Sequence, residues 1–260
     1  MSQKEDVAKN VSGDHSDANK QRVALVTGAS RGIGLAAAQS LCELGFQVAI
    51  HYRSKPELAK SAQLSMPHSQ TFCYDLSVKG SCEALMAEVS EKMGTVSVLV
   101  NNAGMSCDGL VFSATEKDFD LMVDLNYKAT FLLSKYALKP MMKQRWGRII
   151  NITSVVGHVG HRGQSVYCST KSAITAFTQS LAAEAGRFGV LCNCIAPGYI
   201  DTQMTAAMPD KVKAELMKSI HLGKVGKPQD IGNAVAFLAS HQASYITGTT
   251  LHINGGMQGC

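Results

Sequence analysis

Ser154, Tyr167 and Lys171 follow one another with the spacing S-x12-Y-x3-K, and their side chains suit proton transfer to an oxygen. Because a tyrosine and a lysine four residues apart on a helix share one face, the ammonium group can lie beside the phenol. A neighbouring positive charge favours the phenolate, so we expect the pKa of Tyr167 to fall from about 10 toward neutrality. Ser154 ends the strand-like run 148–153, and its hydroxyl can hold an oxygen on which negative charge develops. The pattern predicts Tyr167 as a general acid, although a Tyr–Lys pair of this spacing also occurs on ordinary surfaces.

Nearer the amino terminus, a glycine-rich turn spans residues 27–34 with the spacing G-x3-G-x-G. The apolar run 23–26 before it suits a buried parallel strand, and apolar residues then recur at helical spacing from 33 to 44. A glycine turn between a strand and a helix lets the backbone approach a pyrophosphate, which the N–H groups at the helix start can bind. Alone, such a turn could equally be a tight connection. Combined with the Ser-Tyr-Lys pattern, it indicates reduction of a carbonyl with a nicotinamide.

Further short motifs occur in a fixed order along the chain: Asp75-Leu76, Asn101-Asn102-Ala103-Gly104, Asn126 and the segment 197–202. With these motifs, residues 22–257 resemble the short-chain dehydrogenase/reductase family. Within that family the chain is most similar to the 3-oxoacyl-[acyl-carrier-protein] reductases, through the segments 141–150, 154–157, 245–248 and 251–257.

The resemblance implies NADPH-dependent reduction of a 3-oxoacyl thioester on acyl carrier protein to the 3-hydroxyacyl product, in type II fatty acid synthesis. A general reductase of carbonyls, quinones, steroids or sugars remains an alternative in the same family. A second alternative is a catalytically silent NADPH-binding subunit of a hetero-oligomer, against which the intact Ser154, Tyr167 and Lys171 argue.

The resemblance also implies residue roles. The catalytic set is Asn126, Ser154, Tyr167 and Lys171, with Asn126 holding a water that links Lys171 to solvent. Residues expected at NADPH or NADP+ are Gly28, Ser30, Arg31, Gly32, Ile33, Gly34, Arg53, Asp75, Leu76, Asn102, Ala103, Gly104, Tyr167, Lys171, Pro197, Gly198, Ile200 and Thr202. Asp75 resembles the acid that contacts adenine, and Asn101, Ala103 and Gly104 resemble the turn that shapes the ribose and nicotinamide side. The segment 204–217 resembles a mobile substrate lid, although its methionines could equally fill a core.

The residues after the second expected strand bear on which nicotinamide is used. An NAD enzyme usually has an acid there for the ribose hydroxyls, whereas a 2′-phosphate needs a cation. This chain has His51-Tyr52-Arg53 and no acid. Arg53 and Arg31 could clamp a phosphate, since guanidinium geometry matches phosphate oxygens, or could both be solvated.

Apolar runs and helical patterns alternate after residue 21, which predicts a single-domain Rossmann fold over 22–260. We expect a doubly wound, seven-stranded parallel sheet with helices on both faces. The expected strands are 22–27, 47–52, 71–75, 97–101, 148–154, 190–196 and 249–253. The expected helices are 33–44, 56–65, 78–93, 116–145, 165–187, 205–219 and 228–240. Ligands collect beyond the carboxyl ends of such strands, where the motifs above fall.

Composition excludes several classes of protein. The polar, charge-mixed residues 1–21 predict a disordered extension and fit neither a secretory signal nor a transit peptide. No run reaches the roughly 20 apolar residues of a membrane span, so we expect a soluble cytoplasmic protein, with import into the mitochondrial matrix by an uncleaved or internal signal as the alternative. The eight cysteines form no zinc or disulfide pattern, and we expect Cys192 and Cys194 in the core and no metal. The net charge of +5 is mild and scattered, which argues against nucleic acid.

Two expectations concern partners. In the resembled subfamily, basic residues at or beside Arg145 and Arg187 receive an acidic carrier protein, although cations also favour helix carboxyl ends. Small residues on the 165–187 helix allow close helix packing, and in the family this helix and the 116–145 helix form a four-helix subunit contact. We therefore expect a homotetramer.

Overall fold

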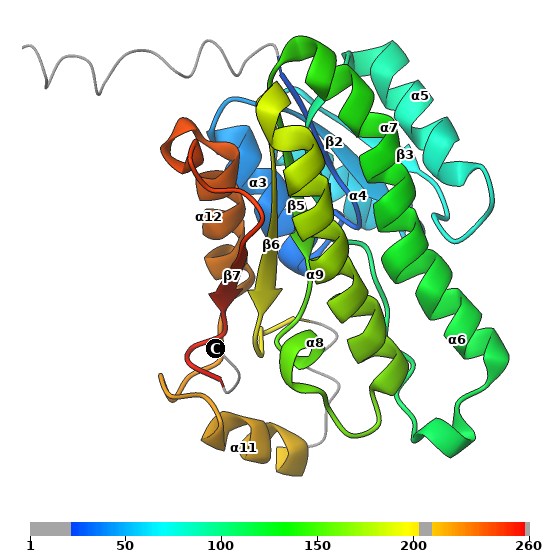
Figure 1. Cartoon of the computed structure of the whole chain (residues 1–260), viewed down its shortest axis with the longest axis vertical. Coiled ribbons are helices and arrows are strands. Elements are labelled where there is room, and N and C mark those ends of the chain that lie inside the picture. The colour runs from blue at the N-terminus through cyan, green and yellow to red at the C-terminus, as the bar shows by residue number, and fades with distance from the viewer. Residues whose placement is uncertain (1–21, 203–209, 258–260) are drawn as a thin grey trace, which may run out of the picture.

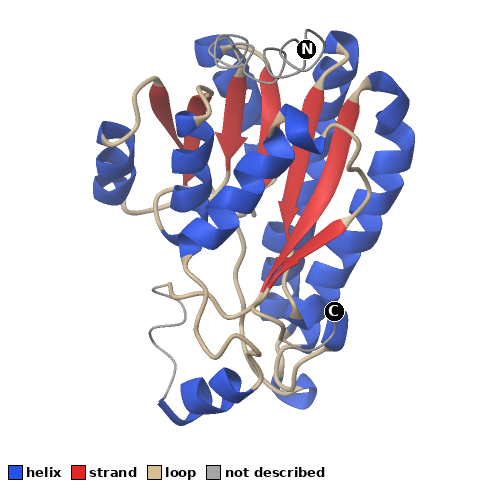
Figure 2. Cartoon of the chain, turned by 90° about the vertical axis from the view of Figure 1, so that its left-hand side faces the viewer, coloured by secondary structure: helices blue, strands red, loops and turns tan. Residues whose placement is uncertain are grey.

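The chain folds around one parallel sheet. The computed structural model describes residues 22–202 and 210–257, with side chains described for 22–202 and 213–257. Seven strands pair in the order β3-β2-β1-β4-β5-β6-β7, every pair parallel (Figures 1 and 2). The strands are β1 Val23–Val26, β2 Gln47–Tyr52, β3 Ser69–Cys73, β4 Val96–Asn101, β5 Gly147–Ile152, β6 Val190–Pro197 and β7 Thr250–Ile253. The doubly wound order reverses between β1 and β4, which is where such sheets bind ligands.

Helices cover both faces of this sheet (Figure 1). In chain order, the longer ones are α3 Gly32–Glu43, α4 Pro56–Leu64, α5 Ser81–Met93, α6 Glu116–Met122, α7 Ala129–Gln144, α9 Ser165–Ala185, α11 Asp210–Lys218 and α12 Pro228–Ala239. One core packs α3, α4 and α12 on one face, and a second packs α5, α7 and α9 on the other. Successive residues of one strand enter opposite cores, as Leu25 and Val26 do. Burial of both faces explains why the strands read as continuous apolar runs.

The expected strands and helices agree with the structure to within a few residues, with one interruption. The segment expected as one helix over 116–145 consists of α6, a π-helical segment η2 over Val123–Lys128, and α7. Short turns η1 (Val111–Ser113) and α8 (Val156–Val159) were not expected. The expected 205–219 helix corresponds to α11, while 203–209 and the predicted extension 1–21 lie outside the described residues.

The described part of the chain has no helix long and apolar enough to cross a membrane, and no cluster of three metal-ligating His, Cys, Asp or Glu side chains. Cys192 and Cys194 are buried on β6, as expected, and the Cys194 thiol donates to Thr178 Oγ1 at 3.1 Å. Burial raises the pKa of these two thiols to about 12 and 11, so neither is poised for thiolate chemistry.

Candidate active site

The residues expected at the site meet at the carboxyl ends of the strands, the edge to which the arrows point in Figure 2. The glycine turn follows β1, Asp75 follows β3, Asn102 follows β4, Ser154 follows β5, and Pro197 ends β6. Parallel strands bring these sequence-distant segments to one edge, because all their carboxyl ends point the same way.

Both backbone conformation and close packing require glycine in the turn after β1. Gly28 has φ +64°, a conformation that other residues rarely adopt. A Cβ on Gly34 would lie 2.3 Å from the Gly28 carbonyl oxygen and 2.6 Å from Asn102 Nδ2. The start of α3 therefore sits directly on the turn, in the arrangement that lets a pyrophosphate approach backbone N–H groups. This cradle fits a dinucleotide.

Thr27 and Asn102 lock this turn to the end of β4. Thr27 Oγ1 accepts hydrogen bonds from the N–H groups of Asn102 and Ala103, both at 2.9 Å. Asn102 Nδ2 donates to the Thr27 carbonyl oxygen at 2.8 Å. Sequence reasoning placed Asn102 at the cofactor but missed this structural role, for which the strand-end positions were the only signal.

The adenosine side of the expected cofactor site carries cations and one anchored acid. Arg53 and Arg31 are exposed, Arg53 just beyond β2 and Arg31 at the N-cap of α3. Asp75 Oδ1 accepts from the Ser77 hydroxyl at 2.6 Å and the Ser77 N–H at 3.0 Å. These bonds, the hydroxyl first, hold the pKa of Asp75 below its ordinary value, and the charge of Arg53 adds to the effect. The carboxylate of Asp75 therefore lies near Arg53 but follows β3, and the residues at the end of β2 include no acid.

Tyr167 and Lys171 lie on one face of α9, with Lys171 Nζ 5.6 Å from the centre of the Tyr167 ring. The Lys171 side chain is only 4% exposed, and Nζ donates to the Ile152 carbonyl oxygen at 2.8 Å. Burial lowers the pKa of Lys171 to about 8. Ser154 follows β5, and its side chain hydrogen-bonds with Tyr167 of α9. The structure thus brings the three residues together.

The expected direction of the shift in the Tyr167 pKa was wrong. Burial raises the pKa of Tyr167 to about 12, and hydrogen bonding with Ser154 opposes the rise only in part. The cause is desolvation, which disfavours the phenolate and outweighs a lysine that is itself buried and bonded elsewhere. Tyr167 therefore keeps its proton across the physiological range, as a proton donor must.

Asn126 is fully buried in the π-helical segment and ties the loop after β4 to α9. Its Oδ1 accepts from the Met105 N–H and its Nδ2 donates to the Met105 carbonyl oxygen, both at 2.9 Å. Nδ2 also donates to Thr170 Oγ1 at 3.2 Å, one residue before Lys171. A Cβ on Gly104 would lie 3.1 Å from Asn126 Oδ1 and 3.5 Å from Lys171 Nζ. Asn126 and Lys171 are therefore close neighbours, although the proton relay itself stays a prediction.

Three of the expected residues direct their side chains inward. Asn101 Nδ2 donates to Asn151 Oδ1 at 2.8 Å and to Ser134 Oγ at 3.1 Å, so this side chain fastens the end of β4 to its neighbours, and the expected place of the turn on the ribose side stays a prediction. Leu76 and Ile200 are each 4% exposed and pack in the two cores. The expected cofactor contacts of Leu76 and Ile200 stay predictions.

The segment after β6 returns toward the glycine turn. Gly198 donates its N–H to the Ile253 carbonyl oxygen at 3.0 Å, and a Cβ there would lie 2.7 Å from Asn254. Thr202 Cγ2 lies 3.7 Å from the ideal Cβ position of Gly32. The expected contacts at Pro197, Gly198 and Thr202 are therefore spatially compatible with those at the turn.

Arg145 and Arg187 lie together but away from the other site residues. Arg145 Nη2 donates to the Arg187 carbonyl oxygen at 3.4 Å, and both side chains are exposed. They follow α7 and α9, at the amino ends of β5 and β6. The six residues of β5, roughly 20 Å, separate them from the edge that holds Ser154.

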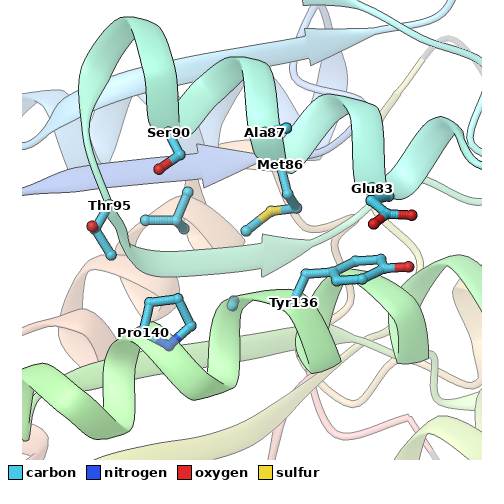
Figure 3. A pocket seen from close by; sticks show the side chains of 9 residues that line it. Glu83, Met86, Ala87, Ser90, Thr95, Tyr136 and Pro140 are labelled. Carbon is cyan, nitrogen blue, oxygen red and sulfur yellow. The ribbon is translucent and has the colours of Figure 1, made fainter.

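A separate hollow of about 250 Å³ lies between α5 and α7 (Figure 3). Met86, Val96 and Pro140 contribute apolar surface, and Glu83 and Tyr136 lie at one end. None of the expected site residues lines it. The candidate site is therefore defined by the side chains at the sheet edge and not by this hollow.

Comparison with known proteins agrees with this geometry. Residues 28–258 match a family model described as enoyl-(acyl carrier protein) reductase. The chain is 44% identical to the 3-oxoacyl-[acyl-carrier-protein] reductase FabG of Rickettsia bellii, over 91% of this chain and 96% of that protein. It is 41% identical to the protein of that name from Vibrio cholerae, over 91% of this chain and 97% of the relative. The chain belongs to the short-chain dehydrogenase/reductase family.

A solved structure gives the same fold. The crystal structure of a putative gluconate dehydrogenase from Agrobacterium tumefaciens superimposes with a TM-score of 0.86 at 28% identity, over 91% of this chain and 95% of that one. As a member of the family, the protein is an oxidoreductase that uses a nicotinamide cofactor.

Proposed function

We propose that the protein reduces the 3-oxo group of an acyl thioester carried on acyl carrier protein to a 3-hydroxy group, using NADPH. The observation that carries this proposal is the convergence of Ser154, Tyr167 and Lys171 beside a glycine turn built for a dinucleotide. The names of the relatives from Rickettsia bellii and Vibrio cholerae support the substrate class.

The cofactor would lie across the carboxyl edge of the sheet. When bound, NADPH supplies a hydride for the ketone carbon. The turn 28–34 would hold its pyrophosphate, and Arg53 with Arg31 would hold the 2′-phosphate, because the end of β2 lacks the acid that would repel it. Asp75 would face the adenine and Lys171 the nicotinamide ribose.

The chain's own residues supply the acid chemistry. The Ser154 hydroxyl would hold the ketone oxygen where negative charge develops. Tyr167, which keeps its proton, would donate it to that oxygen and so complete the alcohol. The Lys171 ammonium, with Asn126 beside it, would stabilise the resulting phenolate and return a proton from solvent.

The position of Arg145 and Arg187 places a condition on carrier docking. A carrier bound there is at the wrong edge of the sheet to reach Ser154 of the same chain. If two copies pack α7 and α9 antiparallel about a two-fold axis, the arginine pair of one copy lies near the site of the other. Phe119 and Phe131, 48% and 41% exposed on α6 and α7, supply apolar surface for such a contact. We therefore propose a homotetramer in which docking and chemistry use different subunits.

Steady-state kinetics of the purified chain tests the proposal. The substrates to compare are a 3-oxobutanoyl thioester on acyl carrier protein, the same group on coenzyme A, a free 3-oxobutanoate ester, a 2-enoyl thioester and a keto-gluconate, the oxidised form that NADPH can reduce. We expect kcat/KM with NADPH to be highest for the carrier-bound ketone. Preference for the enoyl thioester or the keto-gluconate would overturn the proposal, and equal rates on the carrier-bound ketone and the free ester would favour a general carbonyl reductase. No turnover with any of the five would favour the silent subunit.

A further inference from the structure

His51 is a buried histidine at the end of β2 whose two ring nitrogens both make hydrogen bonds to the backbone. The side chain is 2% exposed. Its Nδ1 lies 3.1 Å from the Gly28 nitrogen, and its Nε2 lies 3.0 Å from the Tyr74 carbonyl oxygen. A backbone N–H can only donate and a carbonyl can only accept, so Nδ1 must be the acceptor and Nε2 must carry the proton. The two partners fix one neutral tautomer.

The backbone of His51 holds the next residue of the same turn. The Ala29 N–H donates to the His51 carbonyl oxygen at 2.8 Å. The N–H groups of Gly28 and Ala29, which are consecutive in the glycine turn, therefore both donate hydrogen bonds to His51 of β2. Since Thr27 fastens the turn to the end of β4, His51 supplies the fastening on the opposite side.

The second ring nitrogen extends this connection to β3. Tyr74 continues the β2–β3 ladder, because its N–H donates to the Tyr52 carbonyl oxygen at 3.0 Å. Asp75 is the next residue, and Arg53 lies two residues beyond His51. The imidazole ring thus joins the turn after β1 to the end of β3 across β2, at the adenosine side of the proposed cofactor site.

We propose that His51 is a positioning residue that holds the glycine turn and the Asp75 end of β3 in the arrangement that binds the cofactor. The proposal rests on the cofactor site proposed above. Of the two ring hydrogen bonds, we expect the one from Gly28 to contribute more to cofactor affinity. Loss of the His51 Nδ1 acceptor would leave a partly buried N–H of the glycine turn without a partner. Burial lowers the pKa of His51 to about 4, despite the opposing effects of the Tyr74 bond and of Asp75, which keeps the ring neutral at working pH.

Two near-isosteric variants separate the two bonds. In His51→Asn, the amide oxygen takes the place of Nδ1 and can still accept from Gly28, whereas the bond to Tyr74 is lost. In His51→Gln, the amide nitrogen reaches the place of Nε2 and can still donate to Tyr74, whereas the acceptor for Gly28 is lost. Both variants replace the imidazole ring by a neutral amide side chain. If the ring only filled space, the two variants would lose cofactor affinity and stability together.

The decisive measurement is NADPH dissociation constant by titration calorimetry, with kcat at saturating cofactor on the 3-oxobutanoyl ester. For His51→Gln we expect NADPH to bind about tenfold more weakly, the cost of one lost hydrogen bond, with kcat changed by less than about twofold. For His51→Asn we expect affinity within about threefold of the parent. Equal affinities in both variants and the parent would overturn the proposal, as would a parallel loss of kcat and thermal stability in both.

A second pair of measurements needs no turnover and no cofactor. Amide hydrogen exchange over residues 27–30 should be faster in His51→Gln than in His51→Asn. In the parent protein, nitrogen NMR of the His51 ring should show the proton on Nε2 at pH 7. A proton on Nδ1, or a charged ring, would overturn the assignment even if neither variant folds. If the parent showed this tautomer but bound no NADPH, the proposed function would be wrong. The hydrogen bonds by which the His51 ring joins the turn after β1 to the end of β3 would still be confirmed.

Discussion

Lys171 Nζ lies 5.6 Å from the centre of the Tyr167 ring, yet its hydrogen bond goes to the Ile152 carbonyl oxygen, 2.8 Å away. The lysine is thus anchored to the end of β5 and not to the phenol. Burial raises the pKa of Tyr167 to about 12 and lowers that of Lys171 to about 8. Compared with the same groups in water, the phenol gives up its proton at higher pH and the ammonium group at lower pH. Tyr167 is poised as an acid, and the buried lysine is poised to exchange a proton near neutral pH.

Replacement of Tyr167 by Phe should abolish turnover and leave NADPH binding nearly unchanged, because it removes the proton donor and little else. Loss of a general acid lowers rates by roughly 10²–10⁴-fold. The measurement is kcat on the 3-oxobutanoyl ester, with NADPH affinity by calorimetry as the control. A variant that keeps a tenth or more of the parent kcat would exclude Tyr167 as the acid.

Replacement of Arg53 by Asp should move cofactor preference from NADPH toward NADH, since an acid repels the 2′-phosphate and can bind ribose hydroxyls. Arg31 can compensate in part, so Arg31→Ala combined with Arg53→Asp should shift the ratio further. The ratio of kcat/KM for the two cofactors measures the effect. An unaltered ratio in the double variant would mean that neither arginine holds the phosphate.

Replacement of Gly34 by Ala should weaken cofactor binding and destabilise the protein by roughly 1–3 kcal/mol, because the new Cβ meets the Gly28 carbonyl oxygen at 2.3 Å. Gly186→Ala is the matched control, since a Cβ there meets nothing within 4 Å. Urea unfolding and NADPH titration of both variants test the difference. Comparable behaviour of the two variants would contradict the close packing of α3 on the turn.

The pKa of His51 predicts a loss of stability in acid. The native ring has a pKa of about 4 and the unfolded ring about 6.5, so the unfolded state binds the extra proton first. The contribution of His51 to the free energy of unfolding is therefore fully present above about pH 6.5. It falls by roughly 3 kcal/mol as the pH drops toward 4. Urea unfolding from pH 7.5 to 4 should show a smaller decline in His51→Asn than in the parent. Parallel declines would mean that the native ring titrates normally.

The strands were predictable because both of their faces are buried, which gives runs such as 23–26 and 98–100 no polar interruption. Ser154 was expected at the carboxyl edge of the sheet because it follows a strand, and Tyr167 and Lys171 were expected on one face of a helix because they are four residues apart. The direction of the shift in the Tyr167 pKa could not be predicted, since spacing along a helix places a charge beside the phenol but says nothing of how dry the surroundings are.

The two hydrogen bonds of the His51 ring could not be predicted from the sequence either, and the reason is different. They depend on the lateral order of the sheet, which puts the turn after β1 and the end of β3 on either side of β2. Spacing along the chain shows only that these segments end strands. The π-helical turn at Asn126 is equally hidden, because 116–145 reads as one continuous helical pattern.

The last prediction concerns the carrier. If an acidic carrier docks on Arg145 and Arg187, their joint replacement by Glu should raise KM for the carrier-bound substrate at least about tenfold and weaken its dependence on salt, because opposite charges steer encounter. The free ketone ester should be reduced normally, since Ser154 lies at the other edge of the sheet. Lys60→Glu, exposed on α4 against the opposite face, controls for a charge reversal elsewhere on the surface, although it changes the net charge by about half as much. Equal losses on both substrates would indicate a folding defect, and no loss on either would remove the docking site and favour the general carbonyl reductase.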